Sequence, residues 1–139
     1  MKTTNFQRKK FKKIADKYDL DLILAFGSQV KGERHSESDL DIAVLPKKNK
    51  FNLKKYSALV FDLEKFFSDQ KVDLTFIDHA DPLLLEKIKE SAFLLYGQKR
   101  KFEEFQIYAF NRFQDYQPFF KLEEKSVNKF IQELNYACR

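Results

Sequence analysis

The sequence has very little of several residue types, and each shortage excludes a class of protein. It has one cysteine, Cys138, so no disulfide can form within the chain, which points to a reducing compartment. No apolar run approaches the ~20 residues that a helix needs to cross a bilayer. The basic N-terminal segment also lacks the apolar stretch of a secretory signal. We therefore expect a cytoplasmic protein with no membrane partner.

Glycine and proline are scarce as well, with three of each in 139 residues, and tryptophan is absent. No glycine-rich linker, low-complexity tract or internal repeat interrupts the chain. Hydrophobic residues make up 43% of the sequence and include 16 phenylalanines, so a folded core can be built largely from Phe, Leu and Ile. The sequence predicts one domain over residues 1–139, with a core at about 14–97 and a helical tail at about 101–137.

The positive charge of the chain is unevenly distributed. The formal net charge is +5, and basic residues concentrate at residues 2–13, 47–55 and 99–101. These clusters are either solvated helix faces or a surface that attracts a polyanion or an acidic partner. Neither an aromatic-interleaved RNA-binding segment nor a zinc-ligand spacing is present. Direct nucleic-acid binding is thus an alternative that the sequence does not favour.

Hydrophobic periodicity predicts the order of helices and strands. Helices are expected over residues 5–18, 51–67, 82–91 and 101–137, and strands over residues 20–26, 39–45, 71–77 and 93–97. Pro118 should interrupt the last helix, whose final part, residues 122–137, would turn Val127, Phe130, Ile131 and Leu134 inward. This order predicts an α/β or α+β fold, in which a small mixed sheet is flanked by helices and followed by a helical tail.

The segment "FGSQVKGERHSESDLDIAV", residues 26–44, contains the most distinctive pattern. Side chains alternate along a strand, so Asp39 and Asp41 should share one face while Leu40 and Ile42 enter the core. Two carboxylates at this spacing repel each other, and a divalent cation relieves the repulsion. Hard oxygen ligands of this kind suit Mg²⁺.

A third carboxylate can join this pair from another strand. Within "KVDLTFI", the side chains of Val72 and Leu74 share one face and leave Asp73 on the other. If the two strands are neighbours, Asp73 lies beside Asp39 and Asp41. Three carboxylates on one sheet face can hold two metal ions, an arrangement that serves phosphoryl or nucleotidyl transfer.

The start of the segment supplies candidate phosphate contacts. Gly27, at a strand-to-turn junction, lets backbone approach a phosphate closely, and a helical turn over residues 28–32 would direct its N-terminus to the same anion. Ser28 adds a hydroxyl donor, and Lys31 adds a positive charge within reach.

These residues resemble a known family. Gly27-Ser28, ten residues and then Asp39-x-Asp41 resemble the G-S-x10-D-x-D signature of the polymerase-beta-like nucleotidyltransferase superfamily. With "KVDLTFID", a proline-initiated helix and "AFLLYG", residues 14–97 look like a minimal nucleotidyltransferase (MNT). Proteins of this family are paired with HEPN-domain proteins in toxin–antitoxin modules.

The resemblance implies a function and a set of site residues. Asp39, Asp41 and Asp73 would be the catalytic, Mg²⁺-binding carboxylates, with two metal sites in reach, and Gly27 and Ser28 would contact the triphosphate of ATP. The chain would be an antitoxin that transfers AMP from ATP to a tyrosine of a HEPN ribonuclease toxin, its partner in a hetero-oligomer. Lys31 departs from the family, which often has arginine there.

Two other classes of function stay open at this stage. A nucleotidyltransferase acting on a small molecule, such as an aminoglycoside, usually carries a larger second domain, and this chain leaves little room for one. The chain could instead be a non-catalytic protein that binds a toxin or a nucleic acid through its basic clusters.

Overall fold

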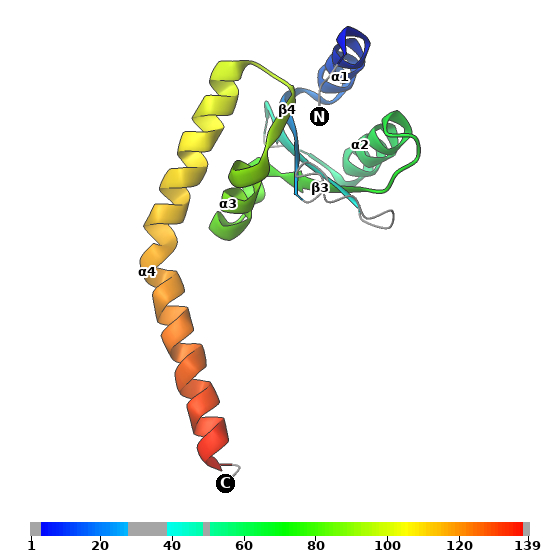
Figure 1. Ribbon diagram of the computed structural model, residues 1–139. Coiled ribbons are helices and arrows are strands. Elements are labelled where there is room, and N and C mark those ends of the chain that lie inside the picture. Colours follow the sequence, from blue (N-terminus) through cyan, green and yellow to red (C-terminus); the bar gives the residue numbers. More distant parts are fainter. Residues whose placement is uncertain (1–3, 28–38, 49–50, 138–139) are drawn as a thin grey trace.

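The computed structural model describes residues 4–27, 39–48 and 51–137 of the chain (Figure 1). The elements follow in the order α1 (Asn5–Tyr18), β1 (Leu20–Phe26), β2 (Leu40–Pro46), α2 (Leu53–Phe66), β3 (Val72–Phe76), the short 3-10 helix η1 (Ile77–His79), α3 (Pro82–Ser91), β4 (Phe93–Tyr96) and α4 (Lys99–Ala137). Apart from η1, which the sequence did not predict, the element types and their order agree with the sequence-based prediction through β4.

The four strands form one mixed sheet in the order β3-β2-β1-β4. β1 pairs antiparallel with both β2 and β4, whereas β2 and β3 are parallel and are joined by α2. The two central strands, β1 and β2, are buried along most of their length. The predicted fold class, a small mixed sheet with flanking helices, is confirmed.

Helices cover both faces of the sheet (Figure 1). One face packs against α1 and α2, in a cluster that includes Phe11, Leu59 and Leu63. The other face packs against α3 and α4 through a smaller cluster that includes Ile88 and Phe105. Burial on both faces explains why "LDLILAF" reads as a nearly continuous apolar run and lacks strict alternation.

The start of α3 follows the sequence-based prediction. Asp81 caps the helix, its side chain accepting a hydrogen bond from the backbone N–H of Leu84 at 2.8 Å. Pro82 occupies the first helical position, where a missing N–H costs nothing because that group has no helical partner.

The predicted break at Pro118 is wrong, because α4 continues through it to Ala137. Proline removes the N–H that would bond to the carbonyl of Gln114, yet aromatic rings on both sides bridge the site. The ring centroids of Phe113 and Phe120 lie 5.8 Å apart, and Tyr116 contacts Phe119 at 5.6 Å.

The side chains expected to face inward near the C-terminus are exposed. The exposed fractions of Val127, Phe130, Ile131 and Leu134 lie between 47% and 60%. α4 extends well past the sheet and the other helices, so no part of the described chain lies beside its second half (Figure 1). Among the described residues, no helix combines the length and apolar character needed to span a membrane.

A polar cluster joins α1 to α2. The hydroxyl of Tyr18 donates a hydrogen bond to Asp62 at 2.6 Å, and the Lys17 ammonium lies 3.0 Å from the same carboxylate. Partial burial alone would raise the pKa of Asp62, but the Tyr18 hydrogen bond and the Lys17 charge together lower it. A lowered pKa means that the folded state favours the ionised carboxylate.

We expect Asp62→Asn to lower the midpoint of thermal unfolding at pH 7 by about 3 to 5 °C, because a hydrogen bond to a charged group is lost from a chain of this size. The stabilisation by Asp62 exists above its ordinary pKa and disappears as the pH falls through the lowered one. The unfolding midpoints of the two proteins should therefore converge in acid. Asp16→Asn, an equal charge change at an exposed position of α1, is the control. A constant difference across the pH range would contradict the role of the ionised carboxylate.

Candidate active site

The parallel pairing of β2 and β3 brings two of the three predicted carboxylates together. Asp41 and Asp73 are direct partners in the strand register. Neighbouring strands lie about 4.8 Å apart, so the two side chains leave the sheet from adjacent positions. Their neighbours Leu40, Ile42, Val72 and Leu74 enter the cluster beneath α1 and α2, so both carboxylates are on the opposite face, the one covered by α3 and α4.

The pKa of Asp41 is raised above its ordinary value. Partial burial is the largest cause, followed by the negative charges of Asp73 and Asp39. Each of these influences disfavours the ionised form of Asp41 in the folded chain. The site thus concentrates negative charge that nothing on the described chain offsets, and a cation would relieve it.

Asp39 lies just before β2 and is exposed. Its neighbour Leu40 is fixed by a hydrogen bond from the Leu40 N–H to the carbonyl of Lys71, at 2.8 Å, which ties the start of β2 to the start of β3. Within residues 4–27, 39–48 and 51–137, no three His, Cys, Asp or Glu side chains form a ready-made metal site. All three residues nevertheless offer hard oxygen donors, and the raised pKa of Asp41 reflects burial first and then the charges of Asp73 and Asp39, which a divalent cation would offset, so the residues fit Mg²⁺.

Gly27 leaves the space that the Asp41 carboxylate occupies. Its φ is +84°, a conformation that favours glycine, and a Cβ at this position would collide with Oδ2 of Asp41. Glycine at the end of β1 is therefore required for two independent reasons. In the structure, Gly27 leaves space for the Asp41 carboxylate. Its contact with a triphosphate stays a prediction.

Ser91 is a residue that the sequence-based reasoning missed. The Gly27 N–H donates a hydrogen bond to the Ser91 hydroxyl at 2.9 Å, and that hydroxyl donates to the carbonyl of Lys87 at 3.2 Å. The end of α3 thus fixes the turn that leaves β1. The only sequence signal is a serine in the last turn of a predicted helix, which is too common to identify such a contact. Because its own N–H is used here, Gly27 would approach a phosphate without donating from that group.

The two remaining candidates for nucleotide binding, Ser28 and Lys31, lie outside the described residues. The helical turn expected at residues 28–32 lies outside them too. The assignment of catalytic, metal-binding and nucleotide-binding roles to individual residues therefore stays a prediction.

We expect Asp41→Asn to make the metal-free chain more stable at pH 7, raising its unfolding midpoint by a few degrees. A carboxyl whose pKa is raised in the folded state opposes folding while it is ionised, and this effect weakens as the pH falls toward that pKa. Removing the charge should therefore stabilise the protein at neutral pH and leave little difference in acid.

Mg²⁺ provides a second measurement on the same variant. It should raise the unfolding midpoint of the original chain and of the Asp16→Asn control, and raise that of Asp41→Asn much less. Equal Mg²⁺-dependent shifts in all three proteins would exclude Asp41 as a ligand.

Known protein structures provide close matches to this arrangement of helices and strands. A chain in a crystal structure of a toxin–antitoxin complex with AMP-PNP aligns with a TM-score of 0.71 and 25% identity, over 90% of this chain and 98% of the other. A chain in a variant of the MntA–HpeT toxin–antitoxin complex aligns with a TM-score of 0.69 and 26% identity, over 94% of this chain and 99% of the other.

A third match, at 22% identity and a TM-score of 0.66, covers 91% of this chain and 97% of the other. It is a chain in a complex of the tri-AMPylated Shewanella oneidensis HEPN toxin with MNT antitoxin, and at this identity it shows the shared fold alone. No curated protein sequence matches the chain.

The family comparison is decisive. The family described as polymerase beta, nucleotidyltransferase matches residues 9–101, a segment that runs from α1 into the first turn of α4 and contains all of the candidate site residues. With the paired carboxylates and the glycine at the end of β1, this match shows that the chain belongs to the polymerase beta nucleotidyltransferase family.

Proposed function

We propose that the chain is an antitoxin of the MNT type that transfers AMP from ATP to a tyrosine of a HEPN-domain toxin. The observation that carries the proposal is the pairing of Asp41 with Asp73 in the strand register. Gly27, which has no side chain, leaves room for the Asp41 carboxylate. Family membership supports nucleotidyl transfer. Similarity to chains from toxin–antitoxin complexes, one of them bound to AMP-PNP, supports the nucleotide and the partner. An ATP-dependent reaction fits a cytoplasmic location.

In the proposed reaction, the tyrosine oxygen attacks the α-phosphorus of ATP. A new O–P bond forms, the bond between the α-phosphorus and the bridging oxygen breaks, and pyrophosphate leaves. We assign the tyrosine proton to Asp73, because its carboxylate is exposed and open to an incoming hydroxyl. Asp39, Asp41 and Asp73 would hold Mg²⁺, which neutralises charge on the phosphates when bound. Gly27, held by Ser91, leaves room for the Asp41 carboxylate.

The arrangement beyond β4 favours a protein acceptor over a small molecule. From Lys99 to Ala137 the chain is one helix, so the described residues contain no second lobe that could enclose a drug-sized substrate. Within that helix, the residues from Lys121 onward are exposed up to Ala137. A protein acceptor would have a surface available here.

We propose that the apolar side of the α4 tail holds the acceptor protein. Phe113, Tyr116, Phe120, Val127, Phe130 and Leu134 recur at three-, four- and seven-residue spacings, so they form one stripe along the helix. This stripe continues the side of α4 that Phe105 and Ala109 bury against α3 and β1. α4 runs past the sheet and the other helices (Figure 1). A protein bound to the stripe would therefore lie along the helix that covers the sheet face carrying Asp41 and Asp73.

The transfer itself is tested by incubating the chain with a HEPN-domain protein encoded beside it, ATP and Mg²⁺, and measuring the intact mass of the HEPN protein. We expect a gain of one or more AMP units. Asp41→Asn and Asp39→Asn should reduce the rate at least about 100-fold, because metal-assisted charge stabilisation contributes several kcal/mol to such reactions.

The same charge change at Asp16, far from the carboxylates, should leave the rate unaltered. Binding of the two proteins is measured in parallel, so a failure to associate is not mistaken for a failure of chemistry. Full AMP transfer by Asp41→Asn would refute the assignment of the carboxylates. Toxin inhibition without any mass gain would favour stoichiometric masking.

The tail is tested by replacing Phe130 and Leu134 with serine. Each buried apolar side chain contributes about 1.5 kcal/mol or more, so the double variant should bind the HEPN protein at least about 100-fold more weakly. The control replaces Leu122 and Tyr136, which are exposed apolar residues on another side of the same helix. It should bind within about threefold of the original chain.

Two results would count against this docking surface. Equal losses in both double variants would indicate that the tail acts through its helicity alone. If light scattering shows that the isolated chain is a dimer that only the Phe130/Leu134 variant dissociates, while binding to the HEPN protein persists, then the stripe holds a second copy of the chain.

A further inference from the structure

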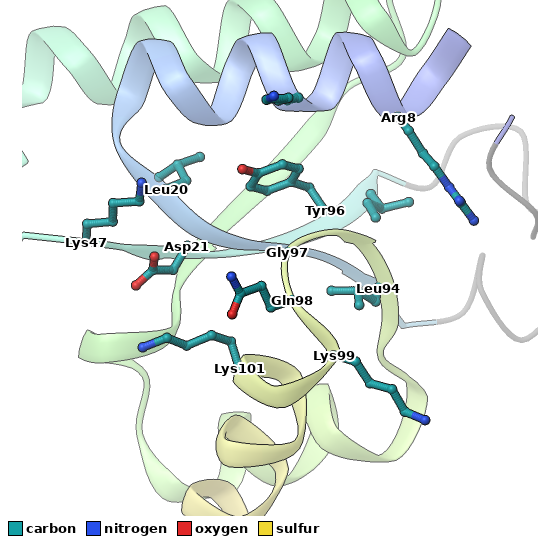
Figure 2. A pocket seen from close by; sticks show the side chains of 12 residues that line it. Arg8, Leu20, Asp21, Lys47, Leu94, Tyr96, Gly97, Gln98, Lys99 and Lys101 are labelled. Atoms are coloured by element: carbon teal, nitrogen blue, oxygen red, sulfur yellow. The ribbon is translucent and has the colours of Figure 1, made fainter. Parts of the chain in front are cut away.

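Residues from all three basic clusters of the sequence line one cavity. This cavity, of about 660 Å³, is lined by Arg8 and Lys12 of α1, by Lys47 after β2, and by Lys99 and Lys101 at the start of α4 (Figure 2). These residues are far apart in the sequence: Lys47 follows Lys12 by 35 residues, and Lys99 follows Lys47 by 52 residues.

The cavity is distinct from the candidate active site. Leu20, the first residue of β1, lines the cavity, whereas Gly27 follows the last residue of that strand. A strand rises about 3.3 Å per residue, so Leu20 lies about 20 Å from Gly27. The other lining strand, β4, is separated by β1 from β2 and β3, the strands of Asp41 and Asp73. A ligand in the cavity would contact none of the three carboxylates.

The positive charge around the cavity is poorly compensated. Within the part of the chain that the structure describes, Lys12, Lys47, Lys99 and Lys101 form no salt bridge, and Asp21 is the one acidic residue in the lining. α4 has no acidic residue in its first turn, although the N-terminal end of a helix favours negative charge. Placing lysines there raises the electrostatic energy of the folded chain unless an anion binds.

A tight turn at Gly97 places Lys99 and Lys101, at the start of α4, beside the cavity. Gly97 has a φ of +129°, and a Cβ at this position would lie 2.7 Å from the carbonyl oxygen of Asp21 and 2.5 Å from Cδ2 of Leu22. Only glycine fits between β4 and α4, so the backbone presses directly against the start of β1. The first turn of α4 is thereby held at the mouth of the cavity.

The lining combines apolar and aromatic surface with the cations. Leu20, Leu94 and Leu95 contribute apolar side chains, and Tyr96 contributes a half-buried ring. In Figure 2, one side of the cavity holds Lys47, Lys101 and Asp21. The other side holds Arg8 and Lys99, and Tyr96 and Gln98 lie between the two sides. A ligand with an oligophosphate chain and a flat apolar group would match both parts.

We propose that this cavity binds an oligophosphate, with a nucleoside di- or triphosphate as the class of ligand that it fits best. Its volume lies within the range of about 300 to 1,000 Å³ that small-molecule sites occupy. Lysines bind phosphate groups as point charges, and the tyrosine ring offers a stacking surface to a base. This second site is independent of the transfer reaction proposed above.

The test measures binding by isothermal titration calorimetry in the presence of EDTA, which keeps Mg²⁺ from the carboxylates. Inorganic tripolyphosphate and ATP are titrated into the original chain and into two double variants. Lys12→Gln with Lys47→Gln removes two cavity cations, and Lys13→Gln with Lys48→Gln removes two exposed neighbours that do not line the cavity. Both variants change the net charge equally.

We expect the cavity variant to bind tripolyphosphate and ATP at least tenfold more weakly, and the control variant to bind within twofold of the original chain. Tighter binding of ATP than of tripolyphosphate would identify a nucleotide, and equal binding would identify the phosphate chain alone. The same loss in both variants would overturn the proposal, because it would show diffuse attraction to net charge. The absence of binding to the original chain would overturn it too. So would a cavity-dependent affinity found only for a single-stranded RNA oligomer, which would make the surface a nucleic-acid interface.

Discussion

The parallel pairing of β2 with β3 is the constraint on which the candidate active site depends. It sets Asp41 beside Asp73, although two carboxylates so placed repel each other. What fixes the pairing is the apolar alternation on the opposite face, where Ile42 and Leu74 pack beneath α1 and α2. A slip of one residue would bury a carboxylate and expose that apolar set, so the register is strongly specified. The helices on one face of the sheet thus stabilise an electrostatically unfavourable arrangement on the other.

This constraint extends to β1 and α3. The space for the Asp41 carboxylate exists because Gly27 has no side chain, and the position of Gly27 depends on the hydrogen bond to Ser91 at the end of α3. β3, the end of β1 and the end of α3 therefore all position the Asp41 carboxylate, whose raised pKa shows that its surroundings disfavour the ionised form. Sites that bind cations or react with phosphates often give up stability in this way, because the charge that destabilises the empty protein binds the ligand.

Much of this was predictable from local patterns in the sequence. Alternating apolar residues identified β2 and β3, and Asp81-Pro82 identified the start of α3, because strand periodicity and helix capping are local properties. Alternation also placed Asp41 and Asp73 on matching faces, but only on the condition that the strands were neighbours, and sheet order depends on contacts far apart in the chain. Ser91 and the meeting of the basic clusters were not predictable for the same reason. The predicted break at Pro118 is wrong because proline's cost is local, whereas the helix there also carries aromatic contacts across the proline.

α4 connects the features that the rest of the fold keeps apart. Its first turn is pressed against the start of β1 by Gly97, its next turns are fixed by Phe105 and Ala109, and its tail extends past the sheet and the other helices. Two separate attachments define the direction of a helix, so the tail's orientation is set by the body of the domain up to Pro118. Beyond that point one backbone hydrogen bond is missing, and bending is easiest there. An anion in the cavity and an acceptor protein on the tail would thus bind the same helix. Any effect of one on the affinity of the other would have to be reciprocal.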